Sequence, residues 1–161
     1  MRPAIREKHD GALADRSSIR LWLRLLSCTM VMEKRVKRRF AEQFGATLPR
    51  FDVLAALDRH PDGMTMGALS SSLLVSNGNV TALVQTLLRD GHVEMSPAPS
   101  DRRASIVRLT EAGRLYFADL AEAHHGWIDA MLAGLSLADR EALYKLLGAL
   151  KASIGQAEEA A

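Results

Sequence analysis

Residues 64 to 113 change from helical to strand-like periodicity in an order that few folds accommodate. Apolar side chains at helical spacing follow Thr65, whose hydroxyl can accept hydrogen bonds from the free backbone amides at a helix start. A second helical stripe follows and stops at Gly91, and two stretches of alternating apolar residues complete the segment. This order predicts a helix, a tight turn, a second helix and a two-stranded ribbon.

The second of these helices, predicted from Ser76 to Arg89, has two faces of different chemistry. Its apolar stripe would pack against the domain and consists of Val80, Leu83, Val84, Leu87 and Leu88. The opposite face has short polar side chains near the helix start, where such groups can reach base edges in the major groove of DNA. An amphipathic helix whose polar face simply lies in water is the alternative interpretation.

The candidate DNA contacts of this helix pair are its small and polar residues. Those expected to face base edges are Asn77, Asn79, Thr81 and Gln85. Ser76 and Gly78 are small enough to let the positive end of the helix approach a phosphate closely. Thr65, at the start of the preceding helix, completes the set.

The ribbon is expected to form a wing beside the helix pair. Alternating residues predict its two strands, with an inward face formed by Val93, Met95, Val107 and Leu109. The polar loop from Pro97 to Ala104 would join the strands, with Arg102 and Arg103 at its tip. A guanidinium loses much hydration when it is buried without a partner, so both arginines should project outward, toward the minor groove of DNA. Asp101 would orient a neighbouring arginine, and a solvated charged hairpin tip is the alternative.

The sequence resembles the MarR family of bacterial transcription regulators. The resemblance is carried by the stretches PRFDVLAAL, SNGNVT, LLRDGHVE and SDRRASIVRLTEAG, and it covers nearly the whole chain after about Ser17. Its most specific part is an Asp-x-Arg followed by Leu-Thr-x-x-Gly, here Asp101, Arg103, Leu109, Thr110 and Gly113. The resemblance implies an obligate homodimer, by default a repressor, in which each subunit supplies one recognition helix and one wing. It also implies a small ligand that alters the spacing between the two heads.

The expected fold is mainly α with a small β-wing, a winged helix-turn-helix head carried by long terminal dimerisation helices. Residues 1–16 are expected to form a flexible arm and residues 17–161 a single domain. Within it, residues 45–110 form the head, and 17–44 and 111–161 the dimerisation helices. A two-fold dimer would set two recognition helices about 34–36 Å apart for a pseudo-palindromic site. Stripes of leucine could equally serve a monomeric bundle.

The terminal helices have distinct apolar patterns. Residues 17 to 44 begin with apolar side chains on more than one face, which favours a subunit interface, and end in a single stripe of Val36, Phe40 and Phe44 that should pack on the head. Thr110 should begin the next helix, which includes Leu115 and ends by Gly134. Ser136 and Asp139 form a capping-box pattern before a last stripe of Leu143, Leu146, Leu147, Leu150 and Ile154.

The net charge of +2 conceals a strong segregation. Residues 20–44 carry seven basic and two acidic side chains, residues 111–161 four basic and eight acidic, and the head six of each. A neutral head is unusual for a DNA-binding protein, because phosphate neutralisation supplies much of the affinity. We therefore expect moderate, salt-sensitive binding. The basic run from Lys34 to Arg39 could contact phosphates or a ligand, or form a solvated helix face.

Composition and missing motifs exclude several classes of protein. An apolar run of about 20 residues is absent, and the charged N-terminus has no apolar segment before a small-residue cleavage site, so we expect a cytoplasmic protein. The single cysteine, Cys28, excludes an internal disulfide and a Cys-x-x-Cys motif. No phosphate loop, paired carboxylates or Gly-x-Ser-x-Gly is present, so neither enzymatic activity nor a cofactor is expected. A helical interaction module that does not bind DNA is the main alternative.

The regulatory ligand is suggested only by the resemblance. The stretches PRFDVLAAL and SNGNVT are most similar to the branch that controls breakdown of hydroxycinnamates and similar aromatic acids. This branch implies a small aromatic ligand or an aromatic acyl-coenzyme A thioester, bound between the dimer helices and the head. The candidate ligand contacts are Arg20, Trp22, Arg24, Leu26, Phe51 and Leu54. Each of them could instead serve as interface core or as a surface charge.

Two other modes of sensing are alternatives. A redox sensor needs an accessible thiol of low pKa, and Cys28 lies in an apolar stretch where a buried, inert cysteine is the usual outcome. A metal sensor would use clustered histidines, but the side chains of His124 and His125 diverge by about 100° on a helix. The other histidines are scattered along the chain.

Overall fold

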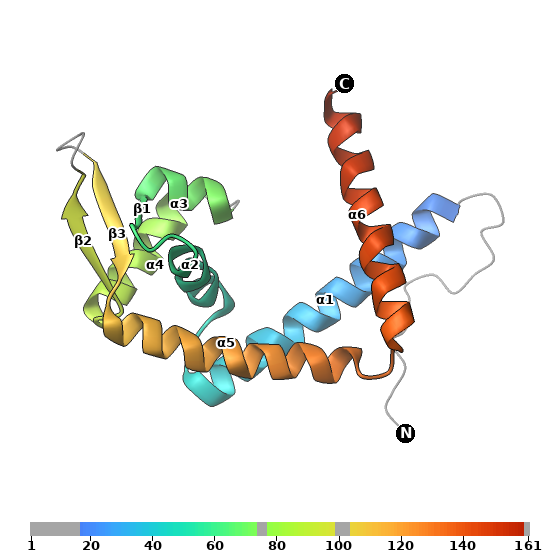
Figure 1. The fold of residues 1–161 in the computed structure, drawn as a ribbon, viewed down its shortest axis with the longest axis horizontal. Helices are drawn as coiled ribbons and strands as arrows, with labels where there is room; N and C mark the ends of the chain where they lie inside the picture. Colours follow the sequence, from blue (N-terminus) through green and yellow to red (C-terminus); the bar gives the residue numbers. More distant parts are fainter. Residues whose placement is uncertain (1–16, 74–76, 99–103, 160–161) are drawn as a thin grey trace. The chain divides into compact units, whose positions relative to one another are not determined.

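The computed structural model describes residues 17–73, 77–98 and 104–159. Figure 1 shows the order of its elements: α1 (Ser17–Phe44), α2 (Leu48–Asp58), β1 (Met64–Thr65), α3 (Met66–Leu73), α4 (Asn77–Arg89), β2 (Val93–Pro97), β3 (Ser105–Leu109), α5 (Glu111–Leu132) and α6 (Leu137–Glu159). This helical architecture with one small sheet confirms the expected fold class. The chain divides into two compact units at His124 and His125, and each unit is described by itself. The predicted arm, residues 1–16, lies outside the described part.

The three strands form one antiparallel sheet in the order β1-β3-β2. The two predicted strands, β2 and β3, are confirmed as a ribbon, and Met64 and Thr65 pair with β3 as a third strand that the sequence pattern did not indicate. The ladder between β2 and β3 extends to Pro97 and Ser105, and the amide of Ala98 donates to the carbonyl of Ala104 at 2.8 Å. Strand pairing thus enters the stretch that the sequence pattern assigns to the wing loop, and the loop is shorter than expected.

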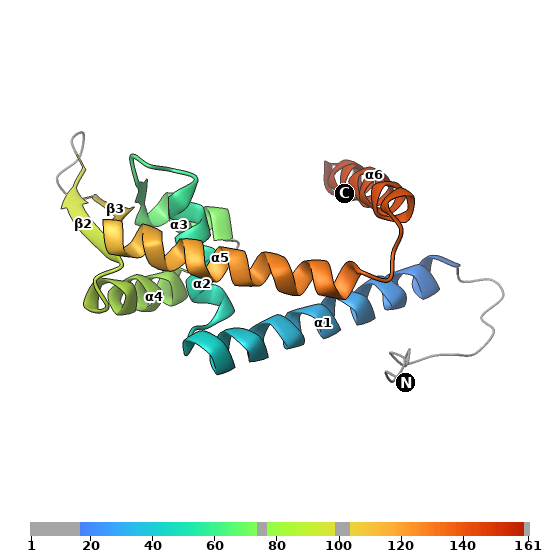
Figure 2. The ribbon, with the colours of Figure 1, turned by 60° about the horizontal axis from the view of Figure 1, so that its bottom comes forward.

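The core of the first unit joins α1 to the head. Val36 and Phe40 of α1 are buried, so the second half of this helix packs on the head as its single stripe predicts. The Phe40 ring lies 5.0 Å from the Phe51 ring of α2, which lies 5.6 Å from Phe117 of α5. Figure 2 shows α2, α3 and α4 gathered beside the sheet. Their buried side chains include Val53, Leu54, Leu57, Leu69, Val80, Val84 and Leu87.

The first half of α1 is rich in apolar residues, yet many of them are exposed in the single chain. Its exposed side chains include Ile19, Leu21, Trp22 and Met30. Cys28 is also exposed, so the expectation of a buried thiol is wrong for the single chain. No side chain from residue 17 to residue 35 is fully buried, because no other part of the described single chain covers this half of the helix. Contiguous exposed apolar surface of this kind is typical of a surface that binds another protein or a ligand.

The second unit contains the end of α5 and the whole of α6. The hydroxyl of Ser136 accepts a hydrogen bond from the amide of Asp139 at 3.1 Å, and the Asp139 carboxylate accepts one from the Ser136 amide at 3.3 Å. This reciprocal pair confirms the predicted capping box. The apolar stripe of α6 is exposed, as is Leu115 on the part of α5 that belongs to the first unit. In the described ranges, no helix has the length and apolar content that a bilayer crossing requires.

Candidate nucleic-acid interface

The helix pair starts where β1 passes directly into α3. The Oγ1 atom of Thr65 accepts a hydrogen bond from the amide of Ala68 at 3.2 Å, which confirms Thr65 as the cap of this helix. The same residue pairs through its backbone with Ile106 of β3. Thr65 therefore fixes the start of α3 to the sheet, a role that the helical spacing alone could not reveal.

Helix α4 separates buried apolar residues from exposed polar residues. Val80, Val84 and Leu87 are buried, as the predicted stripe requires. The candidate base contacts Asn79, Thr81 and Gln85 are exposed. Asn77 and Gly78 open the helix, but their side-chain positions are not described, and Ser76 lies outside the described residues. A helix with one face locked into its domain and polar groups on the other can read a DNA groove.

A junction of hydrogen bonds ties the end of α4 to the start of α5. Gly91, with φ of 74°, turns the chain out of α4 as the sequence predicts. The hydroxyl of Thr110 donates to the carbonyl of Gly91 at 2.7 Å and accepts from the amide of Gly113 at 2.9 Å. The amide of Thr110 also donates to the carbonyl of His92 at 3.1 Å. The Thr-x-x-Gly part of the sequence motif is therefore the linkage between the helix pair and α5.

Two side-chain contacts strengthen this junction, and sequence spacing gives no sign of either. The guanidinium of Arg50 in α2 lies 3.5 Å from the carboxylate of Asp90. The ring of His92 stacks on Tyr116 of α5, with centroids 4.2 Å apart and planes 7° from parallel. Burial raises the pKa of the Tyr116 hydroxyl; Arg50 opposes this shift and Asp90 adds to it. Arg50, one of the six basic residues of the head, therefore pairs with a carboxylate of the protein instead of a DNA phosphate.

The tip of the wing, which includes Asp101, Arg102 and Arg103, lies outside the described residues, and its contact with the minor groove remains a prediction. In the strands that lead to the tip, Val93, Val107 and Leu109 are buried as expected. Met95 is 38% exposed, so its assignment to the inward face is wrong. The reason is its place on β2, an edge strand of the sheet, where it lines a shallow pocket together with Thr65 and Met66.

The candidate ligand contacts do not gather in one place. Phe51 and Leu54 are buried in the head, and the Phe51 ring lies 4.9 Å from the ring of His124. Arg20, Trp22 and Arg24 are exposed along the first half of α1, and Leu26 is half-buried there. Within the described ranges, no group of three histidine, cysteine or acidic side chains is arranged to hold a metal ion.

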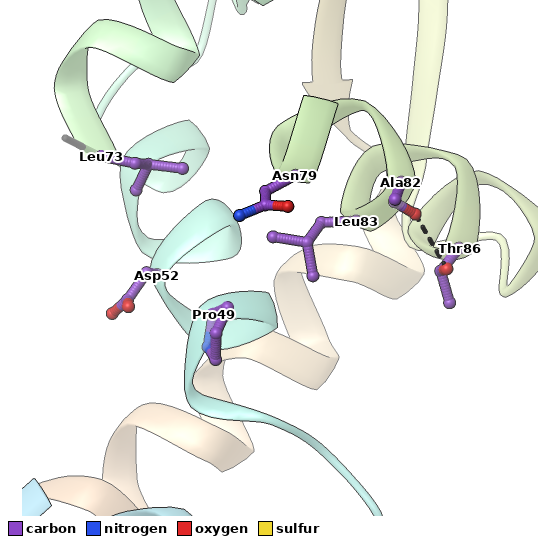
Figure 3. Close-up of a pocket in the computed structure, with 7 residues that line it drawn as sticks. All are labelled: Pro49, Asp52, Leu73, Asn79, Ala82, Leu83 and Thr86. Atoms are coloured by element: carbon purple, nitrogen blue, oxygen red, sulfur yellow. Dashed lines mark hydrogen bonds between the residues drawn. The ribbon is translucent and has the colours of Figure 1, made fainter. Parts of the chain in front are cut away.

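A pocket of about 400 Å³ lies between α2 and α4, and sequence reasoning did not find it. Figure 3 shows Asn79 and Leu83 reaching from α4 toward α2, with Leu73 of α3 above them and Asp52 at the opposite edge from Ala82 and Thr86. Burial, and then the nearby charge of Glu33, raise the pKa of the Asp52 carboxyl, whereas Lys37 lowers it. The described lining residues include no arginine or lysine, so the pocket suits an uncharged, largely apolar group.

Comparisons with known proteins agree on one class of protein. A model of the MarR family matches residues 44–104. The transcriptional activatory protein BadR of Rhodopseudomonas palustris is 38% identical over 64% of this chain and 59% of BadR, so the alignment spans somewhat over half of that relative. The transcriptional repressor YetL of Bacillus subtilis is 26% identical over 84% of this chain and 81% of YetL.

A solved structure extends the similarity to the whole fold. The crystal structure of a MarR family transcriptional regulator from Silicibacter pomeroyi is 33% identical in sequence and has a TM-score of 0.71. The similarity covers 89% of this chain and 99% of that one, so it includes the terminal helices as well as the head.

Proposed function

The chain belongs to the MarR family of transcription regulators, and from this membership we propose that it binds a pseudo-palindromic DNA site as a homodimer and releases it when a small ligand binds. The observation that carries the proposal is the division of α4, where Thr81 and Gln85 are exposed away from a buried stripe and Asn79 is exposed at the edge that faces α2. A regulator needs such a helix to read a groove, whereas a structural helix pair does not.

Dimer formation is supported by apolar surface that the single chain leaves uncovered. The first half of α1 and the length of α6 both expose large apolar side chains, of which Trp22 is 57% exposed and Leu146 is 69% exposed. A second copy of the chain would cover such surface and present two recognition helices. The neutral charge of the head makes this arrangement more important, because one head alone offers little attraction to phosphate.

We assign different roles to the two DNA-contacting elements. Residues Ser76 to Gln85 would read base edges in the major groove, and Arg103, held by Asp101, would enter the minor groove with Arg102 near the backbone. Thr65 sets the position of α3 beside them.

Replacement of Arg103 tests this assignment. Arg103→Ala should weaken binding by roughly tenfold on every duplex tested, because it removes a charged contact that does not depend on sequence. Gln85→Ala, the matched change on α4, should instead alter which bases are preferred at one position of each half-site. Gel shifts on the region upstream of the gene and on point-mutated duplexes measure both effects. Normal affinity of the Arg103→Ala protein would contradict the wing assignment.

We propose that the bound dimer represses transcription by covering promoter DNA, since its relative YetL is named as a transcriptional repressor. BadR is named as an activator, so activation from a site upstream of the promoter is the alternative. A reporter fused to the bound promoter, compared with and without the protein, distinguishes the two because repression lowers and activation raises the signal.

For the ligand, we propose a small aromatic compound whose inserted part is uncharged, which favours an aromatic acyl-coenzyme A thioester over the free acid. The pocket between α2 and α4 supports this choice, since a carboxylate inserted there would approach Asp52 with no cation among the lining residues that the structure describes. A thioester carries no charge at its acyl end. Because Asn79 and Leu83 belong to the recognition helix, an occupant of this pocket would act directly on the DNA-reading element.

Calorimetric titration tests the ligand class. Thioesters of aromatic acids should bind more tightly than the corresponding free acids, and Asp52→Asn should reduce that difference because it removes the negative charge from the rim. Asp58→Asn, on the same helix but outside the lining, should leave the difference unchanged. Absence of heat from both classes of compound, with DNA binding intact, would overturn the ligand proposal alone.

A further inference from the structure

The Arg108 side chain of β3 donates hydrogen bonds to the two segments that flank its strand in the sheet. Its Nε atom donates to the carbonyl of Asp62, in the turn before β1, at 2.7 Å. Its Nη1 atom donates to the hydroxyl of Ser96 on β2 at 3.0 Å. Because β3 is the central strand of the sheet, this one guanidinium spans from the segment before β1 to β2. The contact with Asp62 joins residues 46 positions apart in the sequence.

The turn before β1 is shaped to receive this side chain. Gly63 has φ of 86°, and a Cβ atom added to it would lie 2.5 Å from Cγ of Arg108. The stem of the arginine therefore lies flat against a residue that has no side chain. Val107 and Leu109 face the core, so Arg108 occupies the outer face of the sheet, where it is half-buried. Two of the five N–H donors of this guanidinium are therefore engaged by acceptors within the head.

The hairpin of β2 and β3 depends on such a link for its direction. Strand β1 pairs only with Ile106 and Val107, so beyond those residues the hairpin is held by its own ladder. An isolated two-stranded hairpin is marginally stable and free to change its twist. Arg108 lies one residue to the base side of this pairing, and its bond to Ser96 reaches diagonally to the level of Ile106, the last β3 residue that pairs with β1. Its planar guanidinium can donate in two directions at once, which the single ammonium of a lysine reproduces poorly.

We infer that Arg108 is a positioning residue for the wing, which sets the direction in which the β2–β3 hairpin projects toward DNA. This inference rests on the proposed function. It assigns the affinity effect of Arg108 to the wing rather than to a contact of its own. Arg108 and Arg103 should therefore depend on each other, whereas Arg108 and Gln85 should act independently.

A double-mutant cycle on the DNA that the wild-type protein retains tests the inference. Arg108→Gln and Arg108→Lys should each weaken binding by about tenfold, the second although it keeps the charge. In an Arg103→Ala background the same changes should cost less than about twofold, and in a Gln85→Ala background again about tenfold. Ser96→Ala removes only one of the two acceptors and should give a smaller loss. Arg59→Gln is the control for charge, since the Arg59 guanidinium donates to the carbonyl of Ala55 in α2, the helix that it caps.

The results distinguish a folding defect, failure of the inference and failure of the proposed function. Thermal unfolding of each variant shows whether the head is intact. If Arg108→Gln and Arg108→Lys fail to fold, the cycle is run with Ser96→Ala, whose loss should likewise vanish in the Arg103→Ala background. A loss that remains tenfold without Arg103 would overturn the inference and leave the proposed function standing. A wild-type protein that retains no DNA would overturn the proposed function, and the inference with it.

Discussion

Replacement of Gly113 by alanine should lower the free energy of unfolding by about 3 kcal/mol or more. A Cβ atom at this position would lie 1.8 Å from the carbonyl oxygen of His92 and 2.8 Å from its carbonyl carbon. Both are backbone atoms, and they are held in place by the Thr110 amide that donates to the same oxygen. The clash cannot be relieved by a side-chain rotation, so α5 would have to move away from the start of β2. Chemical denaturation followed by circular dichroism measures the loss.

Gly126→Ala provides the matched control for this change. Gly126 lies on the same helix, and nothing comes within 4 Å of a Cβ atom added there. In a helix interior alanine is favoured over glycine by about 0.5–1 kcal/mol, so this variant should be as stable as the wild type or slightly more stable. If Gly113→Ala unfolded at the same denaturant concentration as Gly126→Ala, the close packing of α5 on His92 would be incorrect.

This junction shows how far sequence patterns reach. The motif Leu-Thr-x-x-Gly marks Thr110 and Gly113 as important through resemblance alone. Capping chemistry accounts for Thr110, because a threonine at a helix start accepts from a free amide, here that of Gly113. The need for glycine comes from a carbonyl 21 positions earlier in the chain, which no local spacing can reveal. Helix boundaries and caps were predictable, and contacts between distant segments were not.

The sheet illustrates the same limit from another side. Alternation predicts both β2 and β3, but only β3 has buried residues at alternate positions, Val107 and Leu109, whereas β2 buries Val93 alone. Strand β1 has only two residues, too few for a periodic pattern, and one of them is also the cap of α3. Met95 was assigned to the inward face by alternation, but an edge strand has less of the core to cover it. Arg108 looked like one of six equivalent cations and proved to be bonded on both sides.

The pocket between α2 and α4 could not be predicted from the sequence for a related reason. Residues of three helices, α2, α3 and α4, line it. In the sequence these residues belong to separate segments, and no pattern indicates that the segments meet. Resemblance directed attention to Arg20 and Arg24 because carboxylates and phosphates require cations. Among its described lining residues, the pocket in the head has a carboxylate and no cation. Our proposal of a thioester rather than a free acid rests on this charge at the rim and not on family membership.

Leu147→Asp should convert the protein to a monomer and weaken DNA binding by roughly a hundredfold. Leu147 belongs to the exposed apolar stripe of α6 together with Leu143, Leu146 and Ile154. A carboxylate buried between two copies of this stripe would lose its hydration without gaining a partner. The affinity for DNA should fall strongly, because a head with no net charge binds one half-site weakly and relies on two half-sites bound at the same time. Analytical ultracentrifugation and gel shifts measure the two effects.

Lys145→Asp separates loss of the interface from a change of charge. Lys145 lies about 160° from Leu147 around the axis of α6. An aspartate at this position should therefore remain in water, and the protein should stay dimeric. Both variants place the same side chain on α6, and only the face differs. If the Leu147→Asp protein remained a dimer with normal affinity, the exposed stripe of α6 could not be the surface that joins two subunits. The requirement for paired heads would then have to be met by the first half of α1, where a charge introduced at the exposed Leu21 repeats the test on the other apolar surface.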